Sequence, residues 1–126
     1  MFEDIPESII NQRARNRIIE VLDYYAIVDN LTPLKPIEIL EMWDEWVDDN
    51  QLESFQKPAF TDEEIEAISA FHDYWLQYCD ELPKTVSSAS ELIMESSWAT
   101  FVAQSKICLE CLMQRGLLSE DRELEN

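Results

Sequence analysis

The sequence has very few of the residues that tight turns and phosphate-binding loops require. It contains one glycine and five prolines among 126 residues. Two-residue β-hairpin turns and glycine-rich phosphate loops both depend on glycine, so we expect neither a β-rich fold nor a nucleotide-binding loop of that kind. No stretch approaches the ~20 consecutive apolar residues of a membrane-spanning helix. These absences favour an all-helical protein.

Positive charge is also scarce. Nine lysines and arginines stand against 27 aspartates and glutamates, which gives a net charge of −18 and a pI near 4.1. Such a charge opposes binding to nucleic acid phosphates and to anionic lipid. We therefore expect no direct nucleic acid or membrane contact, and a basic protein as the partner.

The beginning of the chain lacks the basic segment and apolar stretch of a secretory signal, so we expect a cytoplasmic protein. Its three cysteines, Cys79, Cys108 and Cys111, are an odd number. A reducing compartment keeps such cysteines as thiols, and the expected fold does not need disulfides.

Apolar residues recur at steps of three and four, which predicts helices. The expected helices cover residues 7–28, 36–49, 62–82 and about 88–115. Residues 50–60 lack this period and are interpreted as a connection anchored by Phe55 and Phe60. The predicted fold is an all-α, single-domain antiparallel bundle of about four amphipathic helices over residues 1–118, followed by an acidic, frayed tail at 119–126.

Local signals define several helix ends and faces. Thr61 and Glu64 form a capping-box pattern at the start of the third helix, and Gly116 suits a left-handed C-cap. Ile10 belongs to the apolar stripe of the first helix and Ile37 to that of the second, so both are expected in the core. His72 lies on an apolar stripe and is expected to be a core histidine.

Three cysteines and one histidine make an inventory that zinc accepts, and Cys108 and Cys111 have the spacing of ligands. However, His72 and Cys79 are seven residues apart on one predicted helix, about 10.5 Å along its axis, which is unfavourable for one tetrahedral ion. A redox role for the Cys108 pair is disfavoured, because the C-terminal end of a helix raises the pKa of a thiol. We predict no metal and no cofactor.

A second enzymatic hypothesis uses carboxylates. Glu38 and Glu41, with Glu63 and Glu66 on the following helix, resemble the paired acidic motifs of all-helical nucleoside triphosphate pyrophosphatases of the MazG type. The resemblance implies a magnesium site made by these four residues. This chain differs from that family in having few basic residues near these acids, since residues 51–90 contain only Lys57 and Lys84. First-turn acids such as Glu63 are also favoured by the helix dipole alone.

Recognition of another protein accounts for more of the sequence. Acidic residues crowd the end of the second helix, where the helix dipole disfavours them, and two tryptophans lie among them. Asp23, Tyr24 and Tyr25 are similar to a partner-contact element of the helical immunity proteins for nuclease colicins. The predicted partner surface consists of Tyr24, Tyr25, Glu41, Asp44, Glu45, Trp46, Asp48 and Asp49.

The sequence therefore predicts a binding protein rather than an enzyme, namely an inhibitor or immunity-type protein that neutralises a basic toxin or nucleic-acid-binding protein. The alternatives are the magnesium-dependent pyrophosphatase and a dimeric helical adaptor. Arg13, Arg15 and Arg17 hold three of the nine cations within five residues. We expect them to pair with acids of this chain, or with those of a second copy, so both a monomer and a homodimer remain open.

Overall fold

A computed structural model describes residues 5–27, 34–82 and 85–124, except for the side chain of Asp49. This part of the chain contains helices and no strand. The helices are α1 (Glu7–Ile27), α2 (Pro36–Asp44), α3 (Asp49–Ser54), α4 (Asp62–Glu81), α5 (Ala89–Met94) and α6 (Ser96–Met113).

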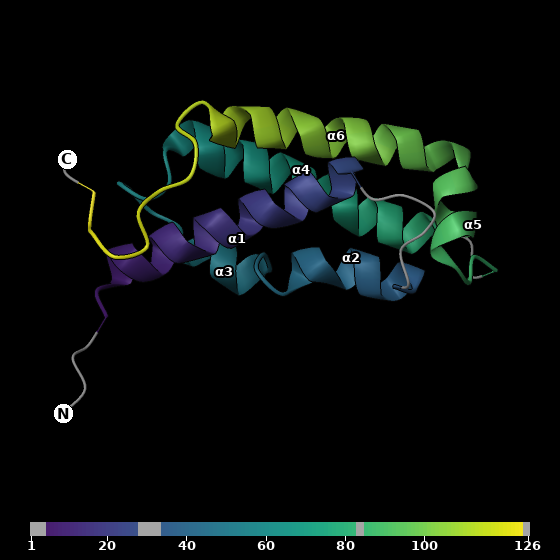
Figure 1. Cartoon of the computed structure of the whole chain (residues 1–126), viewed down its shortest axis with the longest axis horizontal. Coiled ribbons are helices and arrows are strands. Elements are labelled where there is room, and N and C mark those ends of the chain that lie inside the picture. Colours follow the sequence, from purple (N-terminus) through teal and green to yellow (C-terminus); the bar gives the residue numbers. More distant parts are fainter. Residues whose placement is uncertain (1–4, 28–33, 83–84, 125–126) are drawn as a thin grey trace.

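The chain reverses direction from one long element to the next (Figure 1). Helices α1 and α4 run one way, whereas α2 and α6 run the other way. Helix α3 continues the row of α2, and α5 lies at the end of the bundle. Helix α6 packs against both α1 and α4. The predicted all-helical antiparallel bundle is confirmed, but the second expected helix ends early and is followed by a separate short helix, and the fourth is divided in two.

The second expected helix ends before residue 49 because Asp48 caps a new helix. Helix α2 ends at Asp44, and the backbone N–H groups of Trp46 and Val47 then bond to the Trp43 carbonyl. Asp48 accepts a hydrogen bond from the Gln51 N–H at 2.7 Å, which caps α3. A side chain that caps the next amides competes with continuation of the preceding helix. The predicted connection at 50–60 is therefore partly helical.

The fourth expected helix is divided at Glu95. Ser88 caps α5 by accepting from the Glu91 N–H, and α6 begins at Ser96. Leu92 and Trp98 are both buried. On one straight helix they would point about 120° apart. The extended backbone at Glu95 allows both side chains to enter the core.

The core is rich in aromatic rings. Tyr25, Phe71 and Phe101 contact one another, with Tyr25 and Phe101 centroids 5.1 Å apart. Phe55 and Phe60 stack at 4.2 Å and are buried, which confirms their anchoring role. Buried His72 accepts a hydrogen bond at Nδ1 from Trp43 Nε1 at 3.1 Å and is a core histidine, as predicted.

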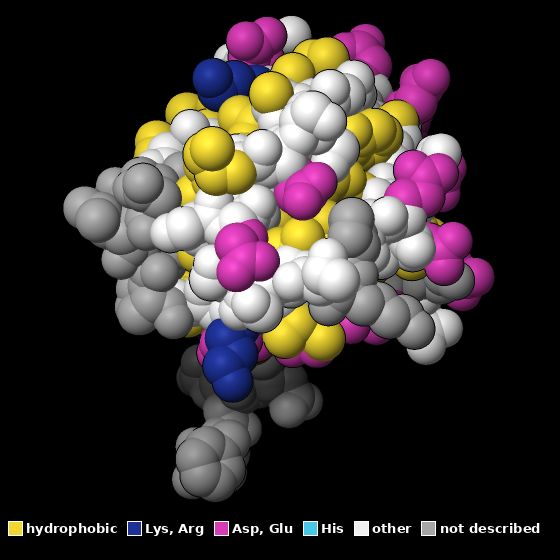
Figure 2. Space-filling view, turned by 90° about the vertical axis from the view of Figure 1, so that its right-hand side faces the viewer, with side chains coloured by type: hydrophobic (Ala, Val, Ile, Leu, Met, Phe, Trp, Pro, Cys, Tyr) yellow, Lys and Arg dark blue, Asp and Glu magenta, His cyan; other side chains and the backbone are white. Residues whose placement is uncertain are grey.

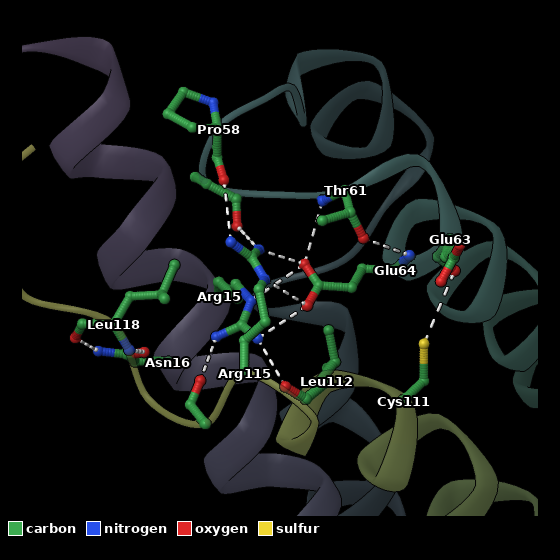
Figure 3. Close-up of polar contacts among 12 residues, drawn as sticks. Arg15, Asn16, Pro58, Thr61, Glu63, Glu64, Cys111, Leu112, Arg115 and Leu118 are labelled. Atoms are coloured by element: carbon green, nitrogen blue, oxygen red, sulfur yellow. Dashed lines mark hydrogen bonds and ion pairs between the residues drawn. The ribbon is translucent and has the colours of Figure 1, made fainter. Parts of the chain in front are cut away.

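One buried carboxylate joins three parts of the bundle (Figure 3). Glu64, on α4, is paired with Arg15 on α1 at 2.9 Å and with Arg115, just after α6, at 2.5 Å. Arg15 is fully buried. Its remaining donors bind the carbonyls of Leu112 and Gly116, both at 2.6 Å. We call Arg15, Glu64 and Arg115 the buried ion cluster.

Glu64 also completes the predicted capping box, because its carboxylate accepts from the Thr61 N–H while the Thr61 hydroxyl accepts from the Glu64 N–H. Burial alone raises the pKa of Glu64. The hydrogen bonds from Arg115, Arg15 and the Thr61 backbone outweigh that effect and hold the pKa below its usual value. Glu64 is therefore ionised in the folded protein at neutral pH.

The segment after α6 lies along α1, whereas the sequence predicted a frayed tail from residue 119. Asn16 binds both backbone groups of Leu118, and Gln12 binds the carbonyls of Ser119 and Arg122 and the N–H of Leu124. Asn16 and Gln12 are almost fully buried. Two buried amide side chains thus hold the described part of the tail by its backbone.

Some apolar residues that the pattern placed in the core lie on the surface instead. Ile10 is 46% exposed and Ile37 is 62% exposed. Met94, on the short α5, is 83% exposed. At the α5 end of the molecule, acidic and hydrophobic side chains are interspersed and basic ones are sparse (Figure 2). None of the helices in the described ranges is long and apolar enough to cross a membrane.

We predict that Glu64→Gln lowers the free energy of unfolding by about 3–5 kcal/mol, because it leaves buried Arg15 without a counter-charge. Glu66→Gln, on the exposed side of the same helix, is the matched control and is expected to change stability by less than about 0.5 kcal/mol. Urea denaturation measures both changes.

The same substitution changes how stability depends on pH. The pKa of Glu64 is lower in the folded state, so its contribution is complete above the unfolded pKa of about 4.3 and is lost as the pH falls through the folded value. Wild type and Glu66→Gln should therefore lose more stability between about pH 5 and pH 3 than Glu64→Gln does. Equal losses in all three proteins would contradict this account of the buried ion cluster.

Candidate functional site

The eight residues of the predicted partner surface do not lie together. Tyr25 is fully buried, and its hydroxyl donates to the Ile39 carbonyl at 2.8 Å. Tyr25 is a core residue, so the prediction that it contacts a partner is wrong, and so is the surface role that the colicin-immunity resemblance implied for it. Tyr24 is half-buried with its ring against that of Tyr25. Trp46 is half-buried on a different side of the bundle, where it faces α1.

The acidic residues of this surface also separate. Glu41, Asp44 and Glu45 are exposed on and just after α2. Asp48 is half-buried and occupied as the cap of α3. The side chain of Asp49 lies outside the described part of the structure. Glu41 and Asp44 are the members of the predicted surface that border a common groove with α4.

This groove, which we call the α2–α4 groove, has a volume of about 380 Å³. Its apolar lining comes from α2, the C-terminal half of α4 and the chain beyond it, namely from Ile37, Leu40, Trp75, Leu82 and Val86. Glu41 and Asp44 form an acidic edge. An apolar floor with carboxylates at its edge suits an apolar side chain that is flanked by a positive charge.

Hydrogen bonds from the core fix the floor of the groove. Trp75 Nε1 donates to the Leu40 carbonyl at 2.9 Å, and Tyr25 holds the neighbouring Ile39 carbonyl. Both carbonyls belong to α2, so two aromatic side chains from other helices bind its backbone. The acids of α2 are therefore presented from a well-anchored helix, which limits the ordering cost of binding.

Cys79 lies in the same groove, and the pKa of its thiol depends on the charges around the groove. Burial, followed by the nearby negative charge of Asp44, raises the pKa of the Cys79 thiol to about 11. Burial also raises the pKa of Cys108, to about 12, and that of Cys111. The thiols are therefore protonated at neutral pH. The direction agrees with the prediction for Cys108 and Cys111, but burial rather than the helix end is the main cause.

The carboxylates of the pyrophosphatase hypothesis do not converge. Within the described ranges, which include Glu38, Glu41, Glu63 and Glu66, no group of three or more acidic, cysteine or histidine side chains is placed to share a metal ion. Glu38 and Glu41 are exposed on α2, and Glu63 and Glu66 are exposed on α4. The acid that matters on α4 is Glu64, between those two, and arginines surround it. The magnesium site that the resemblance implied is therefore not formed by the described residues.

Sequence reasoning missed Ile37 as a site residue. Positions 37, 41 and 44 are spaced by four and three residues, so they share one stripe of a helix. That stripe joins an apolar residue to two acids, and it could have indicated a mixed binding surface rather than a core face. Leu82 and Val86 carried no such local signal, because α4 has to pack beside α2 before they meet this stripe.

Comparisons with family models, with curated proteins and with solved structures give no match to this chain. Its function is therefore inferred from the geometry of the described residues.

We predict that Asp44→Asn shifts the pH midpoint of Cys79 alkylation to lower pH. The substitution removes a negative charge that raises the pKa of this thiol. Mass spectrometry of peptides after timed iodoacetamide labelling measures the midpoint for each cysteine. Cys111 is an internal control, because Asp44 does not contribute to its pKa shift. An unchanged Cys79 midpoint would show that Asp44 does not face the groove.

Proposed function

We propose that this protein is an inhibitor or immunity-type binding module that neutralises a basic protein, and that the α2–α4 groove is its binding site. The supporting observation is that Glu41 and Asp44, two acids of the predicted partner surface, border an apolar groove. That groove also includes the exposed Ile37. An apolar patch at the surface of a highly charged protein is typical of a binding surface.

The two kinds of residue have different roles in this proposal. The net charge of −18 attracts a basic protein over a distance, and Glu41 and Asp44 orient it at the groove. Ile37 and the floor around Leu40 and Trp75 supply short-range apolar contact. Charge therefore governs association, whereas the apolar contact governs dissociation.

Affinity capture from source-cell lysate with four matched proteins tests the proposal. Wild type and the control variant Glu53→Gln/Glu110→Gln should retain the same basic partner. Glu53 and Glu110 are exposed and do not border the α2–α4 groove. The variants Glu41→Gln/Asp44→Asn and Ile37→Ser should retain much less of it. Ile37 is 62% exposed, so its replacement should leave the fold intact.

Binding kinetics with the captured partner separate the two roles. We expect Glu41→Gln/Asp44→Asn to associate about 10-fold more slowly at low salt, with the difference shrinking near 0.15 M salt, where charges are screened beyond about 8 Å. Ile37→Ser should instead dissociate faster at every salt concentration. Identical binding by all four proteins would reject the α2–α4 groove as the site, and capture of no basic protein by wild type would reject the proposed function.

A further inference from the structure

A second groove lies between α1 and α3, on a different set of residues from the proposed partner site. This α1–α3 groove has a volume of about 440 Å³, within the range of small-ligand sites. Its apolar lining includes Ile10 and Ala14 of α1, Trp46, and Phe55. Ile10 is 46% exposed although its position in the helical pattern belongs to the core stripe.

Arg13 lines this groove together with Arg17, Glu7 and Glu120, and its positive charge has no direct ion pair. Its Nε donates to the backbone carbonyl of Glu120 at 2.9 Å. No carboxylate of the described ranges lies within ion-pair distance of its guanidinium group, whereas Arg15 is paired with Glu64, and Arg17 with Glu20 and Glu120. The expected pairing with acids therefore holds for two of the three clustered arginines. Arg13 retains donors for an anion.

Gln51 lines the same groove and carries an unused acceptor. Its Nε2 donates to the Glu45 carbonyl at 3.2 Å. Its Oε1 is shielded from solvent and has no donor among the described residues, and a buried acceptor without a donor costs free energy. A ligand N–H or O–H that meets Oε1 once this half-buried side chain turns toward the groove removes that cost.

One carboxylate of this chain, that of Glu120, already binds at the wall of the groove. Glu120, from the segment after α6, lines the groove and accepts hydrogen bonds from Asn16 and Arg17. The hydrogen bond from Asn16, together with the charges of Arg17 and Arg13, holds the pKa of Glu120 below its usual value. This edge of the groove thus stabilises a carboxylate in its ionised form.

We propose that the α1–α3 groove binds a small aromatic carboxylate that also carries a hydrogen-bond donor. The carboxylate binds the free guanidinium donors of Arg13, the ring packs against Ile10 and Trp46, and the donor reaches Gln51 Oε1. An acidic protein segment suits the groove less well, because the net charge of −18 repels a partner with many negative charges. A single carboxylate gains the local pairing with little of that repulsion.

Indole-3-acetate is a suitable probe, because it combines a carboxylate, an aromatic ring and an N–H donor. Titration calorimetry measures its affinity, and the ¹⁵N spectrum of the tryptophan indoles shows where it binds. We expect the Trp46 indole resonance, assigned with Trp46→Phe, to shift more than the other three. Indole-3-ethanol lacks the carboxylate and 1-methylindole-3-acetate lacks the donor, so each should bind at least about 10-fold more weakly.

Two pairs of variants locate the site in the protein. Arg13→Gln should weaken indole-3-acetate at least about 10-fold, and Arg122→Gln, which removes an exposed arginine of the tail, should not. Ile10→Glu adds a further negative charge to the groove, beside Glu7 and Glu120, and should also weaken binding. Ile27→Glu is its control, because Ile27 is exposed at the far end of the same helix. Thermal melting confirms that each variant is folded.

Each of the other outcomes overturns the proposal. No binding of indole-3-acetate at about 10 mM rejects the ligand class, and equal binding of indole-3-ethanol rejects the role of Arg13. Wild-type affinity in Ile10→Glu places the ligand elsewhere. Concentration-dependent sedimentation that Arg13→Gln abolishes shows that the groove holds a second copy of the chain instead. None of these results depends on the basic partner of the α2–α4 groove.

Discussion

The fold depends on one ionised carboxylate in the interior. Glu64 begins α4 through its capping box and binds two arginines, one from α1 and one from the chain after α6. Those arginines then use their other donors on the carbonyls of Pro58, Ala59, Leu112 and Gly116. A buried charge is tolerable only when its partners are all in place, so the buried ion cluster sets the mutual position of three helices.

The acids on the surface of α2 do not hold the fold together as the buried ion cluster does. Among the described residues, no lysine or arginine forms an ion pair with an acid of α2, and the helix is held instead by Tyr25 and Trp75, which bind its carbonyls from the core. Rigidity and negative potential are therefore supplied by different residues. The hydrogen bonds that fix the floor of the α2–α4 groove do not use the side chains of Glu41 or Asp44. In the proposed binding surface, the negative charge is therefore separate from the contacts that hold the helix.

Signals that act over one turn of helix were readable from the sequence. The Thr61 capping box, the positive φ of Gly116 and the core position of His72 were all predicted and confirmed. The early end of the second helix was missed because the cap at Asp48 competes with a favourable helical pattern. Arg15 and Glu64 are 49 residues apart, and no local pattern links them.

The candidate site was only partly predictable for the same reason. Periodicity shows which residues share a helix face, but not which faces remain uncovered once helices pack. Ile10 and Ile37 were therefore placed in the core, although they border the two grooves. Tyr25 was placed on the surface, although its hydroxyl has a buried carbonyl partner. Apolar residues that depart from their expected burial mark both proposed binding sites.

The segment after α6 is held mainly through its backbone, so its position depends little on its own side chains. Gln12 and Asn16 bind it through backbone atoms of Leu118, Ser119, Arg122 and Leu124. Backbone groups are the same for nearly every amino acid, so evolution can exchange most of these side chains while the segment keeps its path. Proline is the exception at positions 118 and 124, where an N–H must donate. The tail can therefore diverge quickly among descendants of this chain, while the two amides that hold it stay constant.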